Sequence, residues 1–261
     1  MRVFISSSAN GFPETETEYT AWQGFQELGF KPIFYKSEAE LEDCRPDDLI
    51  VGGVTTINRR LGAYGITIDE YDYPSELSGF LGRRVWTDTL EGILSRPEQW
   101  PVFVKPVRNK AFLGFLLKTG REVPRLRSAG PDEPVWCSEP VGFQAEWRVF
   151  VRYGNVWDVR PYRGDWRVHF DADVIERAAR QFISAPAGYA MDFGVTEDGR
   201  TLLIEVNDGI ALGCYGADPV EYAKTLSARW CELVGIHDEC DRYFEASDWK
   251  NRLRNAVSDQ G

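Results

Sequence analysis

Residues 189–207, YAMDFGVTEDGRTLLIEVN, decide how the rest of the chain is interpreted. Two alternating segments flank Asp198-Gly199, a dipeptide that favours a two-residue hairpin loop of type I′. A loop of these two residues places apolar side chains opposite one another on one face: Met191 with Val206, Phe193 with Ile204, and Val195 with Leu202. The sequence therefore predicts a β-hairpin with one consistently apolar face.

The other face of this hairpin carries polar groups. In the same register Asp192 lies directly opposite Glu205, and Asn207 follows two residues further along. Two opposed carboxylates repel each other, so a partner must offset their charge. Three oxygen ligands suit a hard cation but are too few for an all-protein cage, which is the pattern of Mg²⁺ shared with substrate phosphates. The alternative is an acidic solvent face, and a three-residue loop would shift the register and remove the opposition.

Upstream, PVFVKP at residues 101–106 predicts a strand that ends at proline. Alternation places Lys105 and Phe103 on the same side of it. A lysine on an inward face requires an anionic partner, and phosphate is a natural one. The following loop adds Lys110, and Gly114 would let the backbone approach a phosphate closely. Lysine beside proline is common at strand ends, so this motif alone leaves a structural explanation open.

A third motif is SEPVGFQAEWRVFV at residues 138–151. Pro140 interrupts a sheet segment and leaves backbone groups free to bind something other than a strand. Glu146 and Arg148 share one face of the strand that follows; a carboxylate suits ribose hydroxyls and a guanidinium suits phosphate. The alternative is an ion pair within the strand on a solvated face. The next strand supplies Arg160 in a register left open, because the intervening turn fits two or three residues.

The remaining pattern predicts a mixed α/β (α+β) fold in three parts. Residues 1–78 alternate as strand, helix and strands, with strands at 3–5, 32–35 and 48–51 and a helix over 14–28, which indicates a small parallel sheet with helical cover. Residues 79–235 form the body, with helices predicted over 87–94, over 173–183, and from Asp218-Pro219 to about residue 233. Residues 236–261 are predicted to be a C-terminal helical tail.

Composition excludes several classes of partner. The chain has 261 residues with 30 Lys+Arg against 41 Asp+Glu, a net charge of -11. That balance argues against a nucleic-acid duplex or an anionic membrane as the main partner, while a small basic pocket for phosphates stays compatible. No apolar stretch is long enough to span a bilayer, and the N-terminal residues do not resemble a secretory signal.

The 5 cysteines are odd in number and scattered, and there are only 2 histidines. These counts favour a reduced, cytoplasmic chain over a disulfide framework, a zinc site or a histidine-based triad.

Taken in order, the three motifs resemble the ATP-grasp superfamily of ATP-dependent carboxylate–amine ligases. The resemblance spans about residues 80–232, and a small α/β domain precedes this segment, as in that family. Within the superfamily the chain is most similar to the clade named for two arginines and a lysine. The resemblance implies an ATP-grasp fold with an N-terminal pre-ATP-grasp domain, and ATP and Mg²⁺ as cofactors.

The resemblance also implies a role for each candidate residue. Nucleotide-binding roles fall to Arg83 (or Arg84, in place of the usual first lysine), Lys105, Lys110, Glu139, Pro140, Val141 and Glu146. Metal-binding roles fall to Asp192, Glu205 and Asn207. Many members carry an arginine two residues before the first metal ligand, where this chain has Ala190, so the catalytic, charge-stabilising role passes to Arg148 and Arg160.

Three functions follow as hypotheses. The first is a ligase that forms an amide bond through an acyl-phosphate and releases ADP and phosphate. The second is a kinase that phosphorylates a small molecule with the same nucleotide site, and the third is a nucleotide-binding module without catalysis. A small-molecule or peptide carboxylate and an amine are the expected substrates, and a homodimer is left open.

Overall fold

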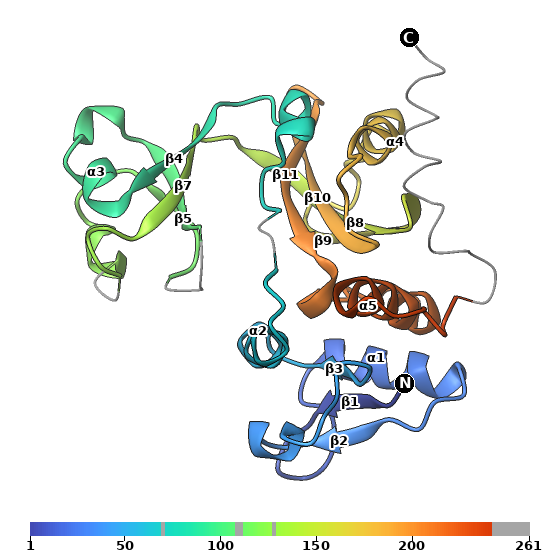
Figure 1. The fold of residues 1–261 in the computed structure, drawn as a ribbon. Coiled ribbons are helices and arrows are strands. Elements are labelled where there is room, and N and C mark those ends of the chain that lie inside the picture. Colours follow the sequence, from blue (N-terminus) through green and yellow to red (C-terminus); the bar gives the residue numbers. More distant parts are fainter. Residues whose placement is uncertain (69–70, 108–111, 127–128, 242–261) are drawn as a thin grey trace. The chain divides into compact units, whose positions relative to one another are not determined.

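The fold combines helices with three sheets, which confirms the predicted mixed α+β class (Figure 1). The structure is a computed structural model that describes residues 1–68, 71–107, 112–126 and 129–241. Packing divides the chain into a first unit, Met1–Phe80 with Gln144–Gly261, and a second unit, Leu81–Phe143. Each unit is described by itself below.

The first unit begins with a three-stranded parallel sheet of order β2-β1-β3. Its strands are β1 (Val3–Ser6), β2 (Ile33–Tyr35) and β3 (Leu49–Val51), and its helices are α1 (Glu16–Glu27) and α2 (Val54–Ala63). α1 begins at a capping box in which the Thr15 side chain accepts from the Glu18 amide and Glu18 bonds back to the Thr15 backbone. The predicted parallel sheet is confirmed.

A four-stranded sheet of order β11-β10-β8-β9 forms the rest of the first unit. Its elements are β8 (Phe143–Arg152), β9 (Asn155–Gly164), β10 (Gly188–Thr196) and β11 (Thr201–Asp208), with helices α4 (Ala172–Gln181) and α5 (Pro219–Val234). One sheet face contributes Phe150 and Ala190 to a core shared with α5, α1 and the parallel sheet. On the other face Phe182, directly after α4, packs edge-on against Tyr189.

The start of α5 follows the predicted signals. The Asp218 side chain accepts from the Glu221 amide, Pro219 is the first helical residue, and Gly235 ends the helix with φ 71°. The predicted helix is therefore confirmed to within about a residue.

The β8–β9 hairpin settles the register that the sequence left open. Arg152 pairs with Asn155, so the loop has two residues, Tyr153 and Gly154, with φ of 49° and 73°. Both φ values are positive, as a type I′ turn requires. A β-bulge between Phe150 and Val151, with Trp157 as the extra residue on β9, then shifts the pairing by one residue and places Arg148 directly opposite Arg160.

In the β10–β11 hairpin the predicted two-residue loop is wrong. The Thr196 amide donates to the Arg200 carbonyl at 2.9 Å, so the loop is the three residues 197–199. Gly199 has φ 82°, the left-handed position that such loops commonly reserve for glycine.

A β-bulge then restores the predicted register at the polar end. Asp192 pairs with Glu205, but Phe193 pairs with Leu203, so Ile204 is the extra residue on β11. The predicted partners of Phe193 and Val195 are wrong by one residue for this reason. The opposition of Asp192 and Glu205 is confirmed.

The second unit is built on a four-stranded antiparallel sheet of order β4-β7-β5-β6. Its elements are β4 (Val85–Thr89), α3 (Leu90–Leu94), β5 (Val102–Pro106), β6 (Phe115–Leu117) and β7 (Pro134–Ser138). Short 3₁₀ helices in the two units are η1 (Glu38–Leu41), η2 (Ser75–Phe80), η3 (Pro97–Gln99), η4 (Val123–Leu126) and η5 (Gly209–Ala211).

The helix predicted over residues 87–94 is wrong in its first three residues. Residues 85–89 pair with β7, and α3 begins only after Thr89, whose hydroxyl accepts from the Gly92 amide. β-branched and aromatic residues at 85–87 favour a strand, and threonine is a good N-cap.

Residues 236–241 are not helical, and the rest of the predicted tail lies outside the described residues. The helical tail and the domain boundaries at residues 78 and 235 stay predictions. Among the helices of the described ranges, none is long and apolar enough to cross a membrane.

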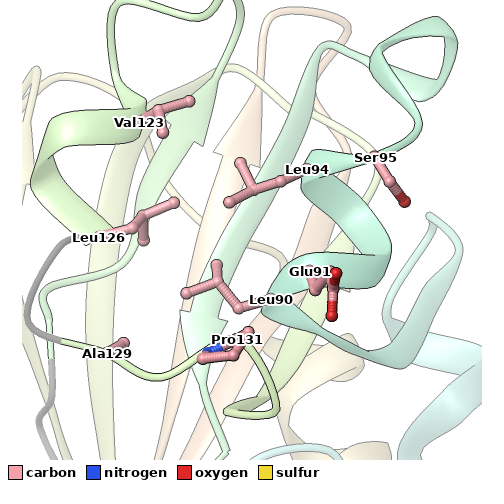
Figure 2. A pocket seen from close by; sticks show the side chains of 8 residues that line it. All are labelled: Leu90, Glu91, Leu94, Ser95, Val123, Leu126, Ala129 and Pro131. Carbon is pink, nitrogen blue, oxygen red and sulfur yellow. The ribbon is translucent and has the colours of Figure 1, made fainter.

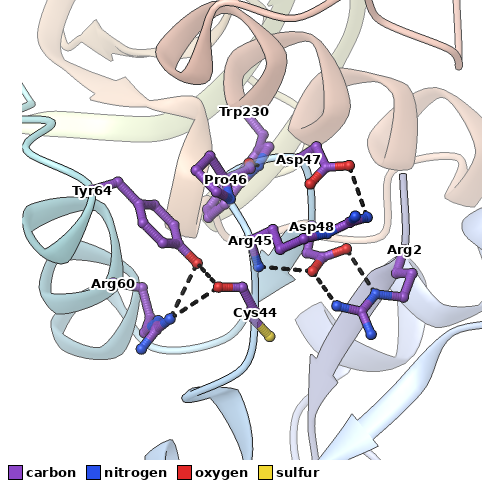
Figure 3. Close-up of polar contacts among 9 residues, drawn as sticks. All are labelled: Arg2, Cys44, Arg45, Pro46, Asp47, Asp48, Arg60, Tyr64 and Trp230. Carbon is purple, nitrogen blue, oxygen red and sulfur yellow. Dashed lines mark hydrogen bonds and ion pairs between the residues drawn. The ribbon is translucent and has the colours of Figure 1, made fainter.

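A cluster of hydrogen-bonded polar residues holds the loop before β3 in place (Figure 3). Asp48 is fully buried and accepts from Arg2 Nε and from the Arg45 amide, both at 2.9 Å. In the same loop the Pro46 carbonyl accepts from Trp230 Nε1 of α5 at 3.0 Å. The loop therefore links the parallel sheet to α5.

Protonation of Asp48 should weaken this link. Burial alone raises the pKa of Asp48, but hydrogen bonds from Arg2 and Arg45 outweigh burial and hold the pKa below its ordinary value. A depressed pKa contributes stability above the unfolded value of about 3.9, and this stability is lost as pH falls through the folded pKa. We expect Asp48→Asn to lower the urea midpoint at pH 7 and to converge on the wild type at an acid pH that protonates Asp48 in the folded state.

Asp47→Asn is the matched control, because Asp47 is partly exposed and forms a surface ion pair with Arg45. Its urea midpoint should stay near the wild-type value at both pH values. A parallel pair of pH profiles for wild type and Asp48→Asn would contradict the assignment.

Candidate functional site

Six of the predicted site residues lie on one face of the four-stranded sheet. Alternation along each strand and the pairs Arg148–Arg160 and Asp192–Glu205 bring them there. The six are Glu146 and Arg148 on β8, Arg160 on β9, Asp192 on β10, and Glu205 and Asn207 on β11.

At the centre of this face Arg148 and Asp192 form a bidentate ion pair. Arg148 Nε donates to Asp192 Oδ1 at 2.8 Å, and Nη2 donates to Oδ2 at 2.7 Å. The two residues are only 6% and 3% exposed. Burial raises the pKa of Asp192 and by itself would lower that of Arg148, but the hydrogen bonds and charge of Asp192 outweigh burial and raise the pKa of Arg148. The guanidinium therefore stays charged.

Asn207 and Glu205 complete the polar end of the hairpin. Asn207 Nδ2 donates to Asp192 Oδ2 at 3.1 Å and to Glu205 Oε1 at 3.5 Å. The charge of Glu205 adds to burial in raising the pKa of Asp192. The two carboxylates thus interact electrostatically, as their opposed positions predict.

Glu146 and Arg148 do not form the ion pair within β8 that was the alternative to a functional role. Glu146 Oε1 accepts from Arg163 Nη1 at 2.8 Å, while Arg148 pairs with Asp192. Arg160 Nε donates to Asp158 Oδ2 at 2.6 Å, so a carboxylate on its own strand offsets the like charge opposite it.

Two tyrosines that the sequence did not assign to nucleotide or metal binding lie close to Arg148. The Tyr215 ring centroid lies 4.7 Å from Arg148 Cζ, and the Tyr215 and Tyr162 rings stack at 5.0 Å and 20°. Burial, and then the charges of Asp192 and Glu146, raise the pKa of Tyr162. Tyr162 could have been found from alternation with Arg160, whereas the position of Tyr215 depends on a loop outside any strand.

In the second unit Lys105 lies on β5 directly opposite Trp136 of β7, with its side chain partly buried. The space beside Gly114 is filled from this strand: a Cβ there would lie 2.7 Å from the Phe103 ring and 3.1 Å from Lys105 Cβ. Gly114 therefore makes room for β5 side chains, contrary to the expectation that it leaves room for a phosphate. Lys110 lies outside the described residues.

The residues after β7 are tied to those before β4. The Glu139 carboxylate accepts from the Arg84 amide at 2.9 Å, and the Glu139 amide donates to the Arg84 carbonyl at 3.0 Å. Arg83 Nη1 donates to the Leu81 carbonyl at 2.9 Å. Pro140 and Val141 lie outside any strand, as the proline predicts.

Residues 80–225 match the family of the ATP-grasp domain, R2K clade family 2. The chain belongs to this ATP-grasp family. The resemblance seen in the three motifs is thereby confirmed, and so is the ATP-grasp fold.

Solved structures show the same fold. A RimK domain protein ATP-grasp from Sphaerobacter thermophilus matches with a TM-score of 0.58 at 14% identity, over 87% of this chain and 98% of that one. D-cycloserine synthetase DcsG matches with a TM-score of 0.57 at 11% identity, over 88% and 100%. D-alanine–D-alanine ligase from Bacillus anthracis matches with a TM-score of 0.52 at 12% identity, over 98% and 99%. No curated protein matches the sequence.

The donor atoms at Asp192, Glu205 and Asn207 fit a hard cation in this ATP-grasp chain. All three side chains offer oxygen, and two of them are carboxylates whose charges act on each other. Within the described ranges no group of three or more His, Cys, Asp and Glu side chains is suited to hold a metal. A cation here would therefore need further oxygen ligands, as Mg²⁺ bound to phosphates has.

A separate hollow of about 480 Å³ lies in the second unit (Figure 2). It is lined by Leu90, Glu91, Leu94, Ser95, Val123, Leu126, Ala129 and Pro131. Its wall is mostly apolar and contains none of the predicted site residues, so it is separate from the candidate site.

Breaking the central ion pair should destabilise the first unit. Arg148→Met leaves the buried Asp192 carboxylate without its main partner, and we expect the free energy of unfolding to fall by about 3 kcal/mol. The double variant Arg148→Met/Asp192→Leu should recover part of this loss, because no unpaired charge stays buried. Urea denaturation measures both.

Arg160→Met is the matched control. The Arg160 side chain is 39% exposed, so its ion pair with Asp158 contributes less to the free energy of unfolding than the buried Arg148–Asp192 pair. The substitution should lower the free energy of unfolding by less than about 1 kcal/mol. Equal losses in Arg148→Met and Arg160→Met would contradict the central role of the buried pair.

Proposed function

We propose that the protein is an ATP-dependent ligase that joins a carboxylate to an amine through an acyl-phosphate and releases ADP and phosphate. One observation carries the proposal: a buried, bidentate Arg148–Asp192 pair lies beside Glu205 and Asn207 on one sheet face of an ATP-grasp chain. Phosphoryl transfer needs positioned charges more than covalent help from the protein, and this face supplies charges of both signs.

Nucleotide-binding roles are assigned residue by residue. Lys105 would bind the α- and β-phosphates, with Arg83 or Arg84 and Lys110 as further cationic contacts. Glu139 and the backbone of Pro140 and Val141 would receive adenine, and Glu146 the ribose hydroxyls. Support comes from the residue types, since cationic side chains suit phosphates and carboxylates suit hydroxyl donors.

Magnesium is assigned to Asp192, Glu205 and Asn207. When bound there, Mg²⁺ would neutralise charge on the phosphate oxygens. Asp192 keeps acceptor capacity for this role, because a carboxylate has about four lone-pair sites and three described donors, two from Arg148 and one from Asn207, use Asp192.

The reaction would proceed in two steps. An oxygen of the substrate carboxylate attacks the γ-phosphorus of ATP, the bond to the β–γ bridging oxygen breaks, and ADP leaves. The amine nitrogen then attacks the acyl carbon, phosphate leaves with the former carboxylate oxygen, and the nitrogen loses a proton. Arg148 and Arg160 would stabilise the charge that develops on the transferred group.

The neighbouring D-cycloserine synthetase and D-alanine–D-alanine ligase are named for reactions on small molecules. A small-molecule or peptide carboxylate and an amine are the substrates proposed for this chain. All five cysteine thiols are buried and free, which supports the proposed cytoplasmic location.

Glu205→Gln tests the metal assignment. The substitution keeps the shape of the side chain but removes its charge, so ADP formation from Mg·ATP should fall by more than about 100-fold. A screen of amino acids and short peptides supplies the acceptors, and calorimetric titration with Mg²⁺ and ADP should show weaker binding in the variant.

Glu197→Gln in the adjacent hairpin loop is the control, because Glu197 is exposed and lies outside the site. Its turnover should match the wild type. Near-full turnover in Glu205→Gln would refute the metal assignment.

Product analysis tests the reaction class. With the correct substrate pair, one inorganic phosphate should appear for each ADP, together with an amide visible by mass spectrometry. ADP without free phosphate, together with a phosphorylated product, would instead identify a kinase. ATP binding that is independent of Mg²⁺ and without turnover would point to a non-catalytic module.

A further inference from the structure

Tyr215 occupies a tight turn between β11 and α5. The turn spans Cys214 to Ala217 and is closed by the Ala217 amide, which donates to the Cys214 carbonyl at 3.0 Å. Tyr215 and Gly216 form its centre, with φ of 46° and 73°. Cys214 and Ala217 are buried in the core of the first unit, at 1% and 4% exposed. The turn is therefore anchored at both ends and presents its central residue outward.

A tyrosine is an unusual choice for this position. A positive φ at a non-glycine residue is uncommon, and turns with two positive φ values favour asparagine, aspartate or glycine. Such outliers are maintained where the surroundings over-determine them, often at functional sites. A role for the Tyr215 ring would explain why a smaller residue does not occupy this position.

The ring covers the guanidinium of Arg148. Its centroid lies 4.7 Å from Arg148 Cζ, within the range of a cation–π contact. The residue before the turn also contacts Arg148: Arg148 Nη1 donates to the Gly213 carbonyl at 3.4 Å. A Cβ on Gly213 would lie 3.3 Å from this nitrogen and 3.5 Å from Tyr215 Cε2, so the fit is close.

The contacts leave part of the guanidinium available. Of its five N–H donors, two bond to Asp192 and one to Gly213, and the other two have no partner among the described residues. A planar cation held by a carboxylate and a ring can offer its remaining donors in one fixed direction.

We propose that Tyr215 is a positioning residue that fixes the plane of the Arg148 guanidinium, with Tyr162 stacked against it as support. The catalytic consequence rests on the proposed function, in which Arg148 stabilises the transferred phosphoryl group. A fixed guanidinium needs no reorganisation as charge develops, so its effect falls on kcat. The contact with Arg148 itself does not depend on that function.

Two substitutions separate the ring from the backbone. Tyr215→Phe keeps the ring and removes only the hydroxyl. Tyr215→Asn removes the ring but suits a positive φ, so the turn is preserved. Tyr19→Asn is the control, because Tyr19 on α1 is 47% exposed against 42% for Tyr215. Thermal unfolding shows whether each variant folds.

The first readout is the Nε–H resonance of Arg148 by NMR, identified by its absence in Arg148→Lys. In wild type and Tyr215→Phe this proton should be shifted by the ring and slow to exchange. In Tyr215→Asn it should lose the ring shift and exchange about tenfold faster. An unchanged signal in Tyr215→Asn would overturn the proposal, whether or not the protein is a ligase.

The second readout is ADP formation. Tyr215→Asn should lower kcat about tenfold at an unchanged KM for Mg·ATP, while Tyr215→Phe and Tyr19→Asn stay near the wild type. A wild-type kcat in Tyr215→Asn would overturn the positioning role even if the NMR signal moves. If wild type itself forms no ADP with any acceptor, the proposed function fails, and the Nε–H signal still decides whether Tyr215 fixes Arg148.

Discussion

The ion pair between Arg148 and Asp192 joins the two central strands of the four-stranded sheet, β8 and β10. A buried charge is tolerated only when it is paired, so each residue depends on the other for its place in the fold. Asn207, the Gly213 carbonyl and the Tyr215 ring all contact this pair from elements that lie later in the chain. The geometry of the candidate site is therefore also a condition for the stability of the sheet that carries it.

Much of the fold could be predicted because its signals are local. Thr15 with Glu18, and Asp218 with Pro219 and Gly235, mark helix ends through contacts within a few residues. Strand β4 was missed although the β-branched and aromatic residues at 85–87 favour a strand. Its residues are held by pairing with β7, more than 40 positions later, and a window around Thr89 contains no sign of that partner.

The candidate site likewise contains contacts that the sequence pattern predicts and contacts that depend on tertiary structure. Alternation within one strand is enough to align Glu146 with Arg148, whereas the predicted opposition of Asp192 and Glu205 holds only because the bulge at Ile204 offsets the longer loop. Alternation cannot show that Arg148 pairs with Asp192, because that contact joins residues 44 positions apart and depends on the order of strands in the sheet. Tyr215 acts from a turn whose direction is set by burial of Cys214 and Ala217, which is again a tertiary constraint.

The bulge at Ile204 has a consequence for comparing relatives of this chain. The loop at 197–199 holds one residue more than the simplest hairpin, and the bulge absorbs that residue before the register reaches Asp192 and Glu205. A relative of equal length with a two-residue loop would keep the two carboxylates opposed only if it also lacked the bulge. Relatives of both kinds would therefore have the same spacing between the two acidic residues and would align without a gap, so the spacing alone does not reveal whether the extra residue lies in the loop or in the strand.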